Sequence, residues 1–317
     1  MKQPLVSIIT PVFNGEAYFR ETFDNVRAQR WRNWEWIVVD DASTDGTWAL
    51  LQDLARKEPR LRIRRLRANI GQAGAVRNIA MARAAGEYIA FLDADDQWEP
   101  TKLRRQVAHL IRHRDVDVVC SWIDFFGDPG RSEQWRRMDW RYDTPEVTHR
   151  QIVTQAMATS SILFRRGVYT ETGGMDEDPR LVIGEDTEFG IRLVMRYRTH
   201  RIRKPLTMYR VNALGKSLSS VQLRVRQRRV LALHEIIAAK DILPPDLLKL
   251  HAALTFYNEA KNNLFHYGMP YRGLLWRSIR SGAAPAKAWV MFALCWLPAP
   301  MLRRVLEALL AASRFGK

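Results

Sequence analysis

The stretch Tyr88-Ile89-Ala90-Phe91-Leu92-Asp93-Ala94-Asp95-Asp96 passes from five apolar residues directly into a cluster of acids. A short apolar run of this length is typical of a buried strand. A second such run, residues 34–39, ends at Asp40-Asp41, and a third, residues 6–10, ends at Pro11-Val12-Phe13-Asn14. In a parallel sheet, ligands bind beyond the carboxyl ends of the strands. If these strands are neighbours, their polar ends converge on one rim, and we expect the functional site there.

Strand and helix signals alternate through the first half of the chain. We expect strands at residues 6–10, 34–39, 61–66, 88–92 and 116–122, separated by helices at residues 17–29, 48–54, 74–84 and 101–113. This rhythm predicts an α/β fold in which a Rossmann-like, mostly parallel sheet is flanked by helices. Residues 124–150 lack clear periodicity and are interpreted as a surface insertion. Strands at 161–164 and 206–211 and a helix at 187–198 are expected after it.

The last 97 residues differ from the rest in charge. The 317-residue chain has 50 Lys and Arg against 34 Asp and Glu, a formal net charge of +16. Residues 221–317 hold 15 basic and 5 acidic residues, which is +10 of that total. Their pattern predicts helices at 221–239, at 246–266 and from about 285. We therefore predict one domain at residues 1–220 and a basic helical region at residues 221–317, and anionic partners are favoured.

The cysteines and the first residues of the chain indicate the cellular compartment in which the protein is expected. Cys120 and Cys295 lie far apart in apolar runs, so a disulfide framework is excluded and a reducing compartment is expected. The first apolar run is too short for a secretory signal and is interrupted by Ser7 and Thr10. We expect a cytoplasmic protein.

The acids at the strand ends predict a metal ion. Four or five carboxylates on one rim repel one another unless a cation lies among them. Oxygen ligands suit Mg²⁺ or Mn²⁺, with phosphate oxygens completing the shell. Asp93 and Asp95 are two residues apart after a strand and can both face one ion. The alternative is that such acids only cap the next helix, an interpretation that we prefer for Asp45.

Other phosphate and metal motifs are incomplete. No G-x-G-x-x-G follows the first strand. Gly215-Lys216-Ser217 would end a P-loop, but Arg210 stands where its first glycine belongs. His234-Glu235 would begin a zinc-protease helix, but Ala238 replaces the second histidine.

At this point a family resemblance becomes specific. Residues 6–14, 38–47, 69–77 and 91–96 together resemble the family 2 glycosyltransferases with the glycosyltransferase A-type (GT-A) fold, over about residues 4–220. The resemblance implies that residues 1–220 form a nucleotide-sugar-binding catalytic domain. It implies that the nucleotide site, usually for UDP, is formed by Pro11, Val12, Asn14, Glu16, Asp40, Asp41, Asn69, Gly71, Arg77, Asp93, Ala94 and Asp95. Asp93 and Asp95 match the DxD acids that hold Mn²⁺ or Mg²⁺, with Asp95 as the direct ligand.

The same resemblance implies the catalytic residues. Gly184-Glu185-Asp186 matches the family's later acidic motif, in which the Asp is the catalytic base. Glu185 would support the site or contact the acceptor. The residues alone leave a second possibility, that Asp186 is the N-cap of a helix. A base opposite the leaving group implies single displacement with inversion at the anomeric carbon.

Two departures from the family pattern are visible. Many relatives have a His after a Tyr-Arg pair, whereas here Tyr209-Arg210 is followed by Val211. Arg210, Lys216 or Ser219 is expected to contact the diphosphate instead. The Gln-x-x-Arg-Trp motif of processive synthases is absent, which predicts transfer of a single sugar.

The apolar residues 288–302 are too short to span a bilayer. Lys287 and Arg303-Arg304 flank them, and Trp289 and Trp296 are residues that favour a membrane interface. We expect peripheral contact with the inner face of the cell membrane, where a lipid-linked acceptor would lie. The alternative is a core helix of the tail.

Three functions remain to be compared. The first is a glycosyltransferase that builds a bacterial-type surface glycan on a glycan or lipid-linked acceptor. The second is a sugar-nucleotide pyrophosphorylase, which requires a Gly-rich basic loop after the first strand. The third is a non-enzymatic basic membrane-binding or RNA-binding protein. The converging acids would repel nucleic acid, so no nucleic acid partner is expected.

Overall fold

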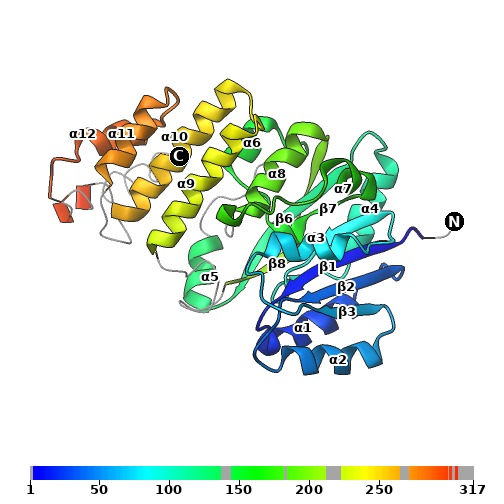
Figure 1. The fold of residues 1–317 in the computed structure, drawn as a ribbon. Helices are drawn as coiled ribbons and strands as arrows, with labels where there is room; N and C mark the ends of the chain where they lie inside the picture. Colours follow the sequence, from blue (N-terminus) through cyan, green and yellow to red (C-terminus); the bar gives the residue numbers. More distant parts are fainter. Residues whose placement is uncertain are drawn as a thin grey trace. The chain divides into compact units, whose positions relative to one another are not determined.

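The computed structural model describes residues 3–136, 144–181, 184–211, 223–264, 271–298, 300–301 and 304–305. The chain forms two compact units that divide between residues 220 and 221 (Figure 1). Each unit has a hydrophobic core of its own. Within the described residues, we find no helix that combines the length and the hydropathy of a membrane span.

The first unit is built on one eight-stranded sheet with the order β3-β2-β1-β4-β7-β6-β8-β5. Its strands are β1 (Val6–Val12), β2 (Trp34–Asp40), β3 (Leu61–Arg65), β4 (Tyr88–Phe91), β5 (Gln97–Trp98), β6 (Val118–Gly127), β7 (Leu163–Arg165) and β8 (Thr199–Val211). β3, β2, β1 and β4 are parallel, as are β6 and β8. β7 is antiparallel to β4 and β6, and β5 is antiparallel to β8. The predicted α/β fold is therefore confirmed, with a mixed sheet.

Helices cover both faces of this sheet. α1 (Glu16–Arg27), α2 (Thr47–Lys57) and α4 (Lys102–Arg112) share one core with alternate residues of β1, β2 and β4. α3 (Ala73–Met81) and α8 (Glu185–Arg196) meet the other face at Phe91 of β4. The Arg77 guanidinium of α3 lies 5.9 Å from the centroid of this ring, and the Phe189 ring of α8 lies 5.9 Å from it, centroid to centroid. Two faces are buried because successive strand residues point to opposite sides.

The structure differs from the expected elements after residue 122. β6 continues to Gly127 because it pairs with β8 along its whole length. β8 begins at Thr199, seven residues before the expected strand. Three helices described in the first unit were not expected: α5 (Pro129–Arg136), α6 (His149–Thr154) and α7 (Arg166–Thr172). The expected surface insertion at 124–150 is therefore partly strand and helix, and its residues 137–143 lie outside the described part.

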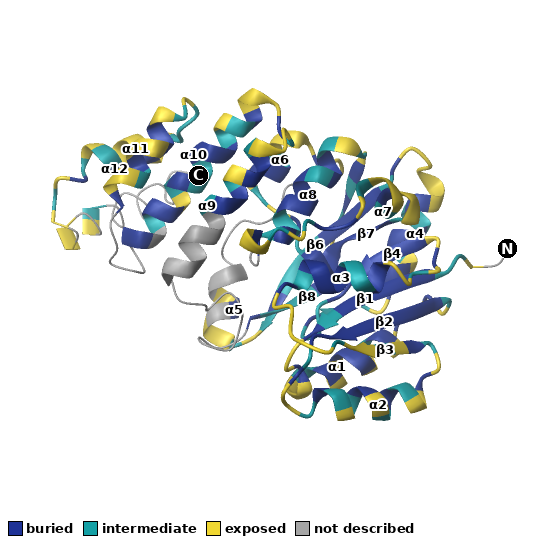
Figure 2. Ribbon diagram, viewed as in Figure 1, coloured by how far each residue is buried: buried dark blue, intermediate teal, exposed yellow. Residues whose placement is uncertain are grey.

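The second unit contains α9 (Leu223–Ala239), α10 (Pro245–Asn262), α11 (Arg272–Arg280) and α12 (Ala286–Ala293). α11 was not expected, because its three arginines interrupt the apolar pattern of the sequence, although Leu275 and Ile279 form a buried apolar face. Figure 2 shows both buried and exposed residues on α10, α11 and α12. A core cluster joins α10, α11 and α12 through Ala260, Leu264, Tyr271, Leu275, Met291 and Cys295.

Candidate active site

A cavity of about 420 Å³ lies at the rim where β1, β2 and β4 end. Val12 of β1 pairs with Asp40 of β2 where both strands end, whereas β4 ends at Phe91 opposite Ile9, three residues earlier. Residues 93–95, which follow β4, line the same cavity as the residues after β1 and β2. Ten of the twelve residues predicted for the nucleotide site line this cavity: Pro11, Val12, Asn14, Asp41, Asn69, Gly71, Arg77, Asp93, Ala94 and Asp95. The other two, Glu16 and Asp40, do not line it.

The loop after β1 is fastened to the loop after β2. Asn14 has a left-handed backbone (φ 51°), and its Oδ1 accepts a hydrogen bond of 2.8 Å from the N–H of Thr44. Glu16 accepts a hydrogen bond of 2.9 Å from the N–H of Gly46. Asp45 accepts one of 3.0 Å from the N–H of Thr47, the first residue of α2, but the N-cap of this helix is Gly46, so the expected capping role of Asp45 is not confirmed. Glu16 therefore stabilises the wall of the cavity and does not face its interior.

The two consecutive acids after β2 have different surroundings. Asp41 lines the cavity and accepts hydrogen bonds of 2.7–3.1 Å from the loop 69–71. Asp40 is fully buried, where it accepts a hydrogen bond of 3.1 Å from the N–H of Ser43 and lies 3.3 Å from Arg65 Nε. Consecutive residues at a strand end point in opposite directions, so only one of the two acids can face the cavity. The expected contact of Asp40 with a nucleotide does not fit this placement.

Arg77 places a buried cation among the acids. Its guanidinium lies 2.5 Å from Asp93 Oδ1 and 3.7 Å from Glu185 Oε1, and its side chain is 5% exposed. Burial lowers the pKa of Arg77, but the charges of Asp93 and Glu185 raise this pKa above its ordinary value. The expectation that the acids depend on an external cation was therefore incomplete, because α3 supplies one.

Protonation also limits the repulsion. Asp96 is buried, and burial followed by the charges of Asp93 and Asp95 raises the pKa of Asp96 well above its usual range. Its Oδ1 accepts a hydrogen bond of 2.9 Å from the N–H of Arg210. Burial and then the same three acids raise the pKa of Tyr209, so its phenol is a neutral group in the cavity wall.

A second cavity of about 190 Å³ contains the predicted base. Asp186 lines it together with Tyr209, which also lines the first cavity. Asp186 Oδ2 accepts a hydrogen bond of 3.2 Å from the Thr159 hydroxyl, and Oδ1 accepts one of 2.7 Å from the N–H of Thr187. This carboxylate lies in the first turn of α8, where the helix dipole favours negative charge. Tyr209 therefore connects the walls of two cavities that hold the two acidic motifs.

Glu185 lines neither cavity and is 6% exposed. Burial, followed by the charge of Asp186, raises the pKa of Glu185 to about 8, against the lowering effect of Arg77. Gly74 makes room for it, because a Cβ at Gly74 would lie 2.7 Å from Glu185 Cγ. Of the two roles expected for Glu185, this placement favours support of the site.

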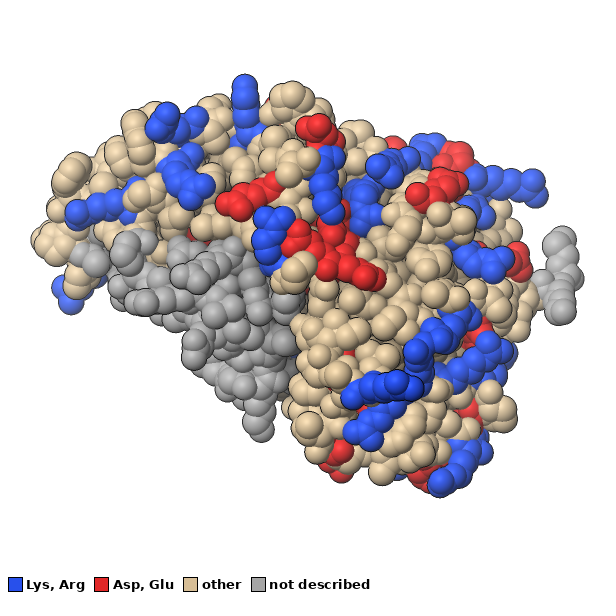
Figure 3. Space-filling model, viewed as in Figure 1, with Lys and Arg blue, Asp and Glu red and all other residues tan. Residues whose placement is uncertain are grey.

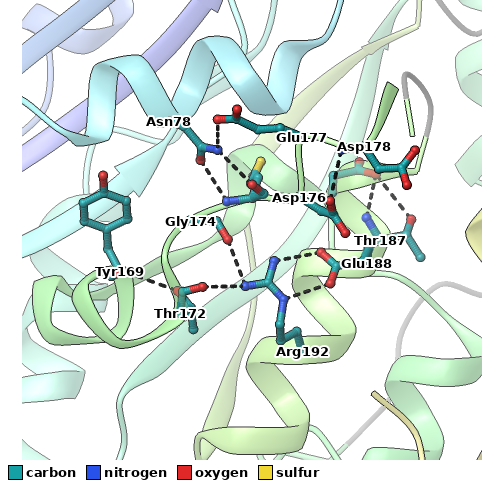
Figure 4. Close-up of polar contacts among 12 residues, drawn as sticks. Asn78, Tyr169, Thr172, Gly174, Asp176, Glu177, Asp178, Thr187, Glu188 and Arg192 are labelled. Carbon is teal, nitrogen blue, oxygen red and sulfur yellow. Dashed lines mark hydrogen bonds and ion pairs between the residues drawn. The ribbon is translucent and has the colours of Figure 1, made fainter. Parts of the chain in front are cut away.

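Hydrogen bonds from α3 and from α8 hold the segment at residues 174–175, which precedes α8 (Figure 4). Arg192 forms two hydrogen bonds of 2.8 Å with Glu188 and donates one of 2.9 Å to the carbonyl of Gly174. Asn78 of α3 donates a hydrogen bond of 2.8 Å to the carbonyl of Met175. Gly184 then adopts φ 108°, which favours glycine and starts α8 directly before the two acids.

Asp93 and Asp95 are the residues that fit a divalent ion. Both line the first cavity, and carboxylate oxygens are ligands that Mg²⁺ and Mn²⁺ prefer. Within the described ranges, no group of three or more His, Cys, Asp or Glu side chains is arranged to hold a metal. Beyond the side chains of these described residues, water and phosphate oxygens can complete the metal shell.

Arg210, one of three candidates for a diphosphate contact, does not line the first cavity. Its Nε donates a hydrogen bond of 2.8 Å to the carbonyl of Asp95, and its Nη2 lies 2.5 Å from Glu21. It therefore supports the turn that carries the acids. The other candidates, Lys216 and Ser219, lie outside the described residues.

Sequence reasoning missed part of each cavity wall. The first cavity is also lined by Phe13, Gly15, Tyr18, Gln72, Ala73, Val76 and Tyr209. The second is also lined by Cys120, Ser121, Trp122, Ile123, Phe125, Gln155, Ala156, Met157, Ala158, Ser161 and Arg201. In the first cavity, the additional residues from Phe13 to Val76 lie within or next to the recognised motifs. For the lining residues on β6, η1 (Thr159–Ser161) and β8, the sequence contains no local signal.

Two sequence relatives illustrate what the chain resembles. The putative teichuronic acid biosynthesis glycosyltransferase TuaG of Bacillus subtilis is 44% identical over 109 residues, which cover 34% of this chain and 43% of TuaG. The match thus spans less than half of that relative. An uncharacterized glycosyltransferase of Methanocaldococcus jannaschii is 27% identical over 231 residues, which cover 70% of this chain and 76% of the relative.

Solved structures share the fold. TarS 1–349 of S. aureus in complex with UDP-GlcNAc has a TM-score of 0.68 at 21% identity and covers 94% of this chain and 87% of its own. The mannosyltransferase PcManGT of Pyrobaculum calidifontis, in complex with GDP-Man and Mn²⁺, has a TM-score of 0.59 at 22% identity over 98% and 81%. The family model described as Glycosyl transferase family 2 matches residues 7–173, more than half of the chain. The protein therefore belongs to glycosyltransferase family 2.

Proposed function

We propose that the protein is an inverting glycosyltransferase that moves one sugar from a nucleotide-diphospho-sugar to a glycan or lipid-linked acceptor. The observation that carries this proposal is the pair of cavities that share Tyr209. The first holds Asp41, Asp93 and Asp95, and the second holds Asp186. Donor and acceptor in adjacent cavities would place the reacting atoms near their junction.

The first cavity is the proposed donor site, and UDP is the proposed nucleotide. Asp41 and the loop 69–71 would hold the nucleoside, and Asp93 and Asp95 would face the diphosphate. Arg77 holds Asp93 at 2.5 Å, which keeps this acid in one place before the donor arrives. Support for UDP comes from TarS, whose structures contain UDP and UDP-GlcNAc.

Asp93 and Asp95 would hold Mn²⁺ or Mg²⁺, which neutralises charge on a leaving diphosphate. The PcManGT complex with Mn²⁺ supports this assignment. The DxD acids alone are too few to complete a metal shell, so binding of metal and nucleotide should be mutually dependent.

Asp186 is the proposed catalytic base. Thr159 and the N–H of Thr187 each donate a hydrogen bond to one of its oxygens, which fixes the carboxylate in the second cavity. A carboxylate held in this way can remove the proton of an acceptor hydroxyl as that oxygen attacks the anomeric carbon. Attack from the side opposite the diphosphate inverts the configuration.

The proposed pathway is synthesis of a cell-surface polysaccharide, as the name of TuaG suggests for that relative. The proposed location is the inner face of the cell membrane, reached through peripheral contact that involves residues 288–302. A pyrophosphorylase is disfavoured, because the loop Pro11-Val12-Phe13-Asn14-Gly15 is neither Gly-rich nor basic. A nucleic acid partner is disfavoured, because acids line the rim.

A donor panel tests this proposal. The protein is incubated with UDP-, GDP- and dTDP-sugars, Mn²⁺ and candidate acceptors, and the release of free nucleoside diphosphate is measured. We expect release from a UDP-sugar by the wild type and by Asp178→Asn, an acid that lines neither cavity, but not by Asp186→Asn. Release of inorganic pyrophosphate from a nucleoside triphosphate and a sugar phosphate would instead indicate the pyrophosphorylase.

A further inference from the structure

The second unit exposes large apolar side chains in one region. Trp276, Trp289, Val290, Trp296 and Met301 are 47%, 54%, 43%, 77% and 55% exposed. In the described part of the first unit, the exposed large apolar residues are Phe13 and Ile70, which lie in two different loops, and Ile111, which lies on α4. Gathered exposed apolar residues mark interaction surfaces, whereas single ones do not.

The opposite side of the same segment is core. Ala288, Met291 and Cys295 are buried, and Met291 and Cys295 belong to the cluster shared with α10 and α11. Their spacing of three and four residues puts them on one helix side, so Trp289 and Val290 point outward. Residues 288–296 thus contribute to the core on one side and are exposed on the other.

Two ring contacts link α11 to α12 and to the residues directly after it. Trp276 stacks on Phe292 with ring centroids 5.4 Å apart, and the Arg272 guanidinium lies 5.4 Å from the centroid of the Trp296 ring. Residues 272 and 276 lie one turn apart on α11, and residues 292 and 296 are likewise four apart. We call Trp276, Trp289, Val290 and Trp296 the aromatic platform.

The charge around the aromatic platform has one sign. Residues 260–306 contain no Asp or Glu, and their basic residues are Lys261, Arg272, Arg277, Arg280, Lys287, Arg303 and Arg304. Figure 3 shows Lys and Arg but no Asp or Glu over the region of α11 and α12 on the face in view. Tryptophans with surrounding Lys and Arg match the boundary between acyl chains and anionic headgroups.

We infer that the aromatic platform binds the surface of a bilayer that contains anionic phospholipid. Trp289 and Trp296 enter the interface, while Arg272, Arg280 and Lys287 face the headgroups. The inference extends the expected linear contact at 288–302 to a surface formed by two helices. The membrane contact itself does not depend on the proposed function. Only its purpose, to bring the enzyme to a lipid-linked acceptor, rests on that function.

Vesicle co-sedimentation of the full chain tests the inference. The vesicles are phosphatidylcholine alone or phosphatidylcholine mixed with phosphatidylglycerol, at low and high salt. The variants are Trp289→Ser/Trp296→Ser, Arg280→Gln/Lys287→Gln, and Ile111→Ser as a control for loss of an exposed apolar residue elsewhere. Circular dichroism and UDP titration of each variant report on the fold and on the donor site separately.

We expect the wild type and Ile111→Ser to sediment with anionic vesicles and to be partly released by salt. The double tryptophan variant should lose about tenfold or more in partitioning. The double charge variant should bind anionic vesicles more weakly and with less salt dependence. All variants should bind UDP with the affinity of the wild type. If the wild type does not bind UDP, the proposed donor site is wrong, and this result is independent of vesicle binding.

Equal sedimentation of the double tryptophan variant and the wild type would overturn the inference, as would a wild type that ignores anionic vesicles. If sedimentation velocity shows a dimer that the double tryptophan variant loses, while vesicle binding is unaffected, the platform is a protein interface and the inference is wrong.

Discussion

Replacement of Arg77 by glutamine tests how the acidic rim is held together. The guanidinium lies 2.5 Å from Asp93 Oδ1 and 3.7 Å from Glu185 Oε1, with 5% of the side chain exposed. The Arg77→Gln substitution would keep some packing volume but remove the positive charge. Asp93 would then lose the positive charge that Arg77 supplies beside it.

The size of the effect follows from burial. Removal of one partner from a fully buried ion pair costs about 3–5 kcal/mol. Asp93 is 29% exposed. Glu185, whose pKa is raised to about 8, is largely protonated at pH 7. Both facts reduce the loss, and we expect about 2–3 kcal/mol. For a unit of this size that corresponds to roughly 5–10 °C in Tm.

Urea unfolding and calorimetry measure this loss, and UDP titration without metal measures the functional effect. We expect metal-free UDP affinity to fall about tenfold, because an Asp93 without its cation repels the diphosphate. Arg83→Gln is the matched control, since Arg83 is exposed just after the same helix. A loss of stability below about 0.5 kcal/mol, as for a surface substitution, would refute the reasoning.

Three further predictions concern the same site. Asp186→Asn should lower transfer by about 10²-fold or more while UDP affinity stays within a few-fold, and an equal loss of both would indicate a structural role for Asp186 in the first turn of α8. EDTA should abolish transfer, Mn²⁺ or Mg²⁺ should restore it, and Asp95→Ala should remove the metal dependence of UDP binding; full activity in EDTA contradicts the metal assignment. Glu185 has a folded-state pKa of about 8 against an ordinary value of 4.5, so its contribution to stability is present below pH 4.5 and lost as the pH rises through 8. Glu185→Gln should therefore gain stability relative to wild type between about pH 5 and pH 8, on the order of 3 kcal/mol, and a pH-independent difference in urea unfolding would show that Glu185 is not buried.

The sequence was sufficient to place the acids at one rim. Three strands with acidic or polar ends predicted a common edge, and their residues line one cavity. This prediction succeeded because β1, β2 and β4 are parallel neighbours, so their carboxyl ends point to the same edge of the sheet. The roles of these residues with a nucleotide stay predictions.

The orientation of single side chains was harder to predict. Asp40 and Asp41 looked equivalent, yet only Asp41 faces the cavity, and the alternation of a strand would have allowed one of the two to be excluded. The ion pair of Arg77 with Asp93 was not predicted, because it depends on how α3 packs across β4.

Contacts between distant segments explain the remaining differences. β7 enters between β4 and β6 although it follows both of them in the chain, and no local pattern specifies an antiparallel insertion. Tyr209 reaches both cavities because β8 runs parallel to β6. In the apolar run 288–302 the sequence singled out Trp289 and Trp296, but not the core contacts of Met291 and Cys295, because these depend on packing against α10 and α11.

Calorimetric titration of UDP, GDP and dTDP into the full chain, with and without Mn²⁺, tests the central claim that the first cavity is a nucleotide-diphosphate site. We predict that UDP binds most tightly, that Mn²⁺ strengthens its binding, and that Asp41→Asn and Asp95→Ala both weaken it at least about tenfold. The absence of binding by all three nucleotides, or unchanged UDP affinity in both variants, would contradict the account.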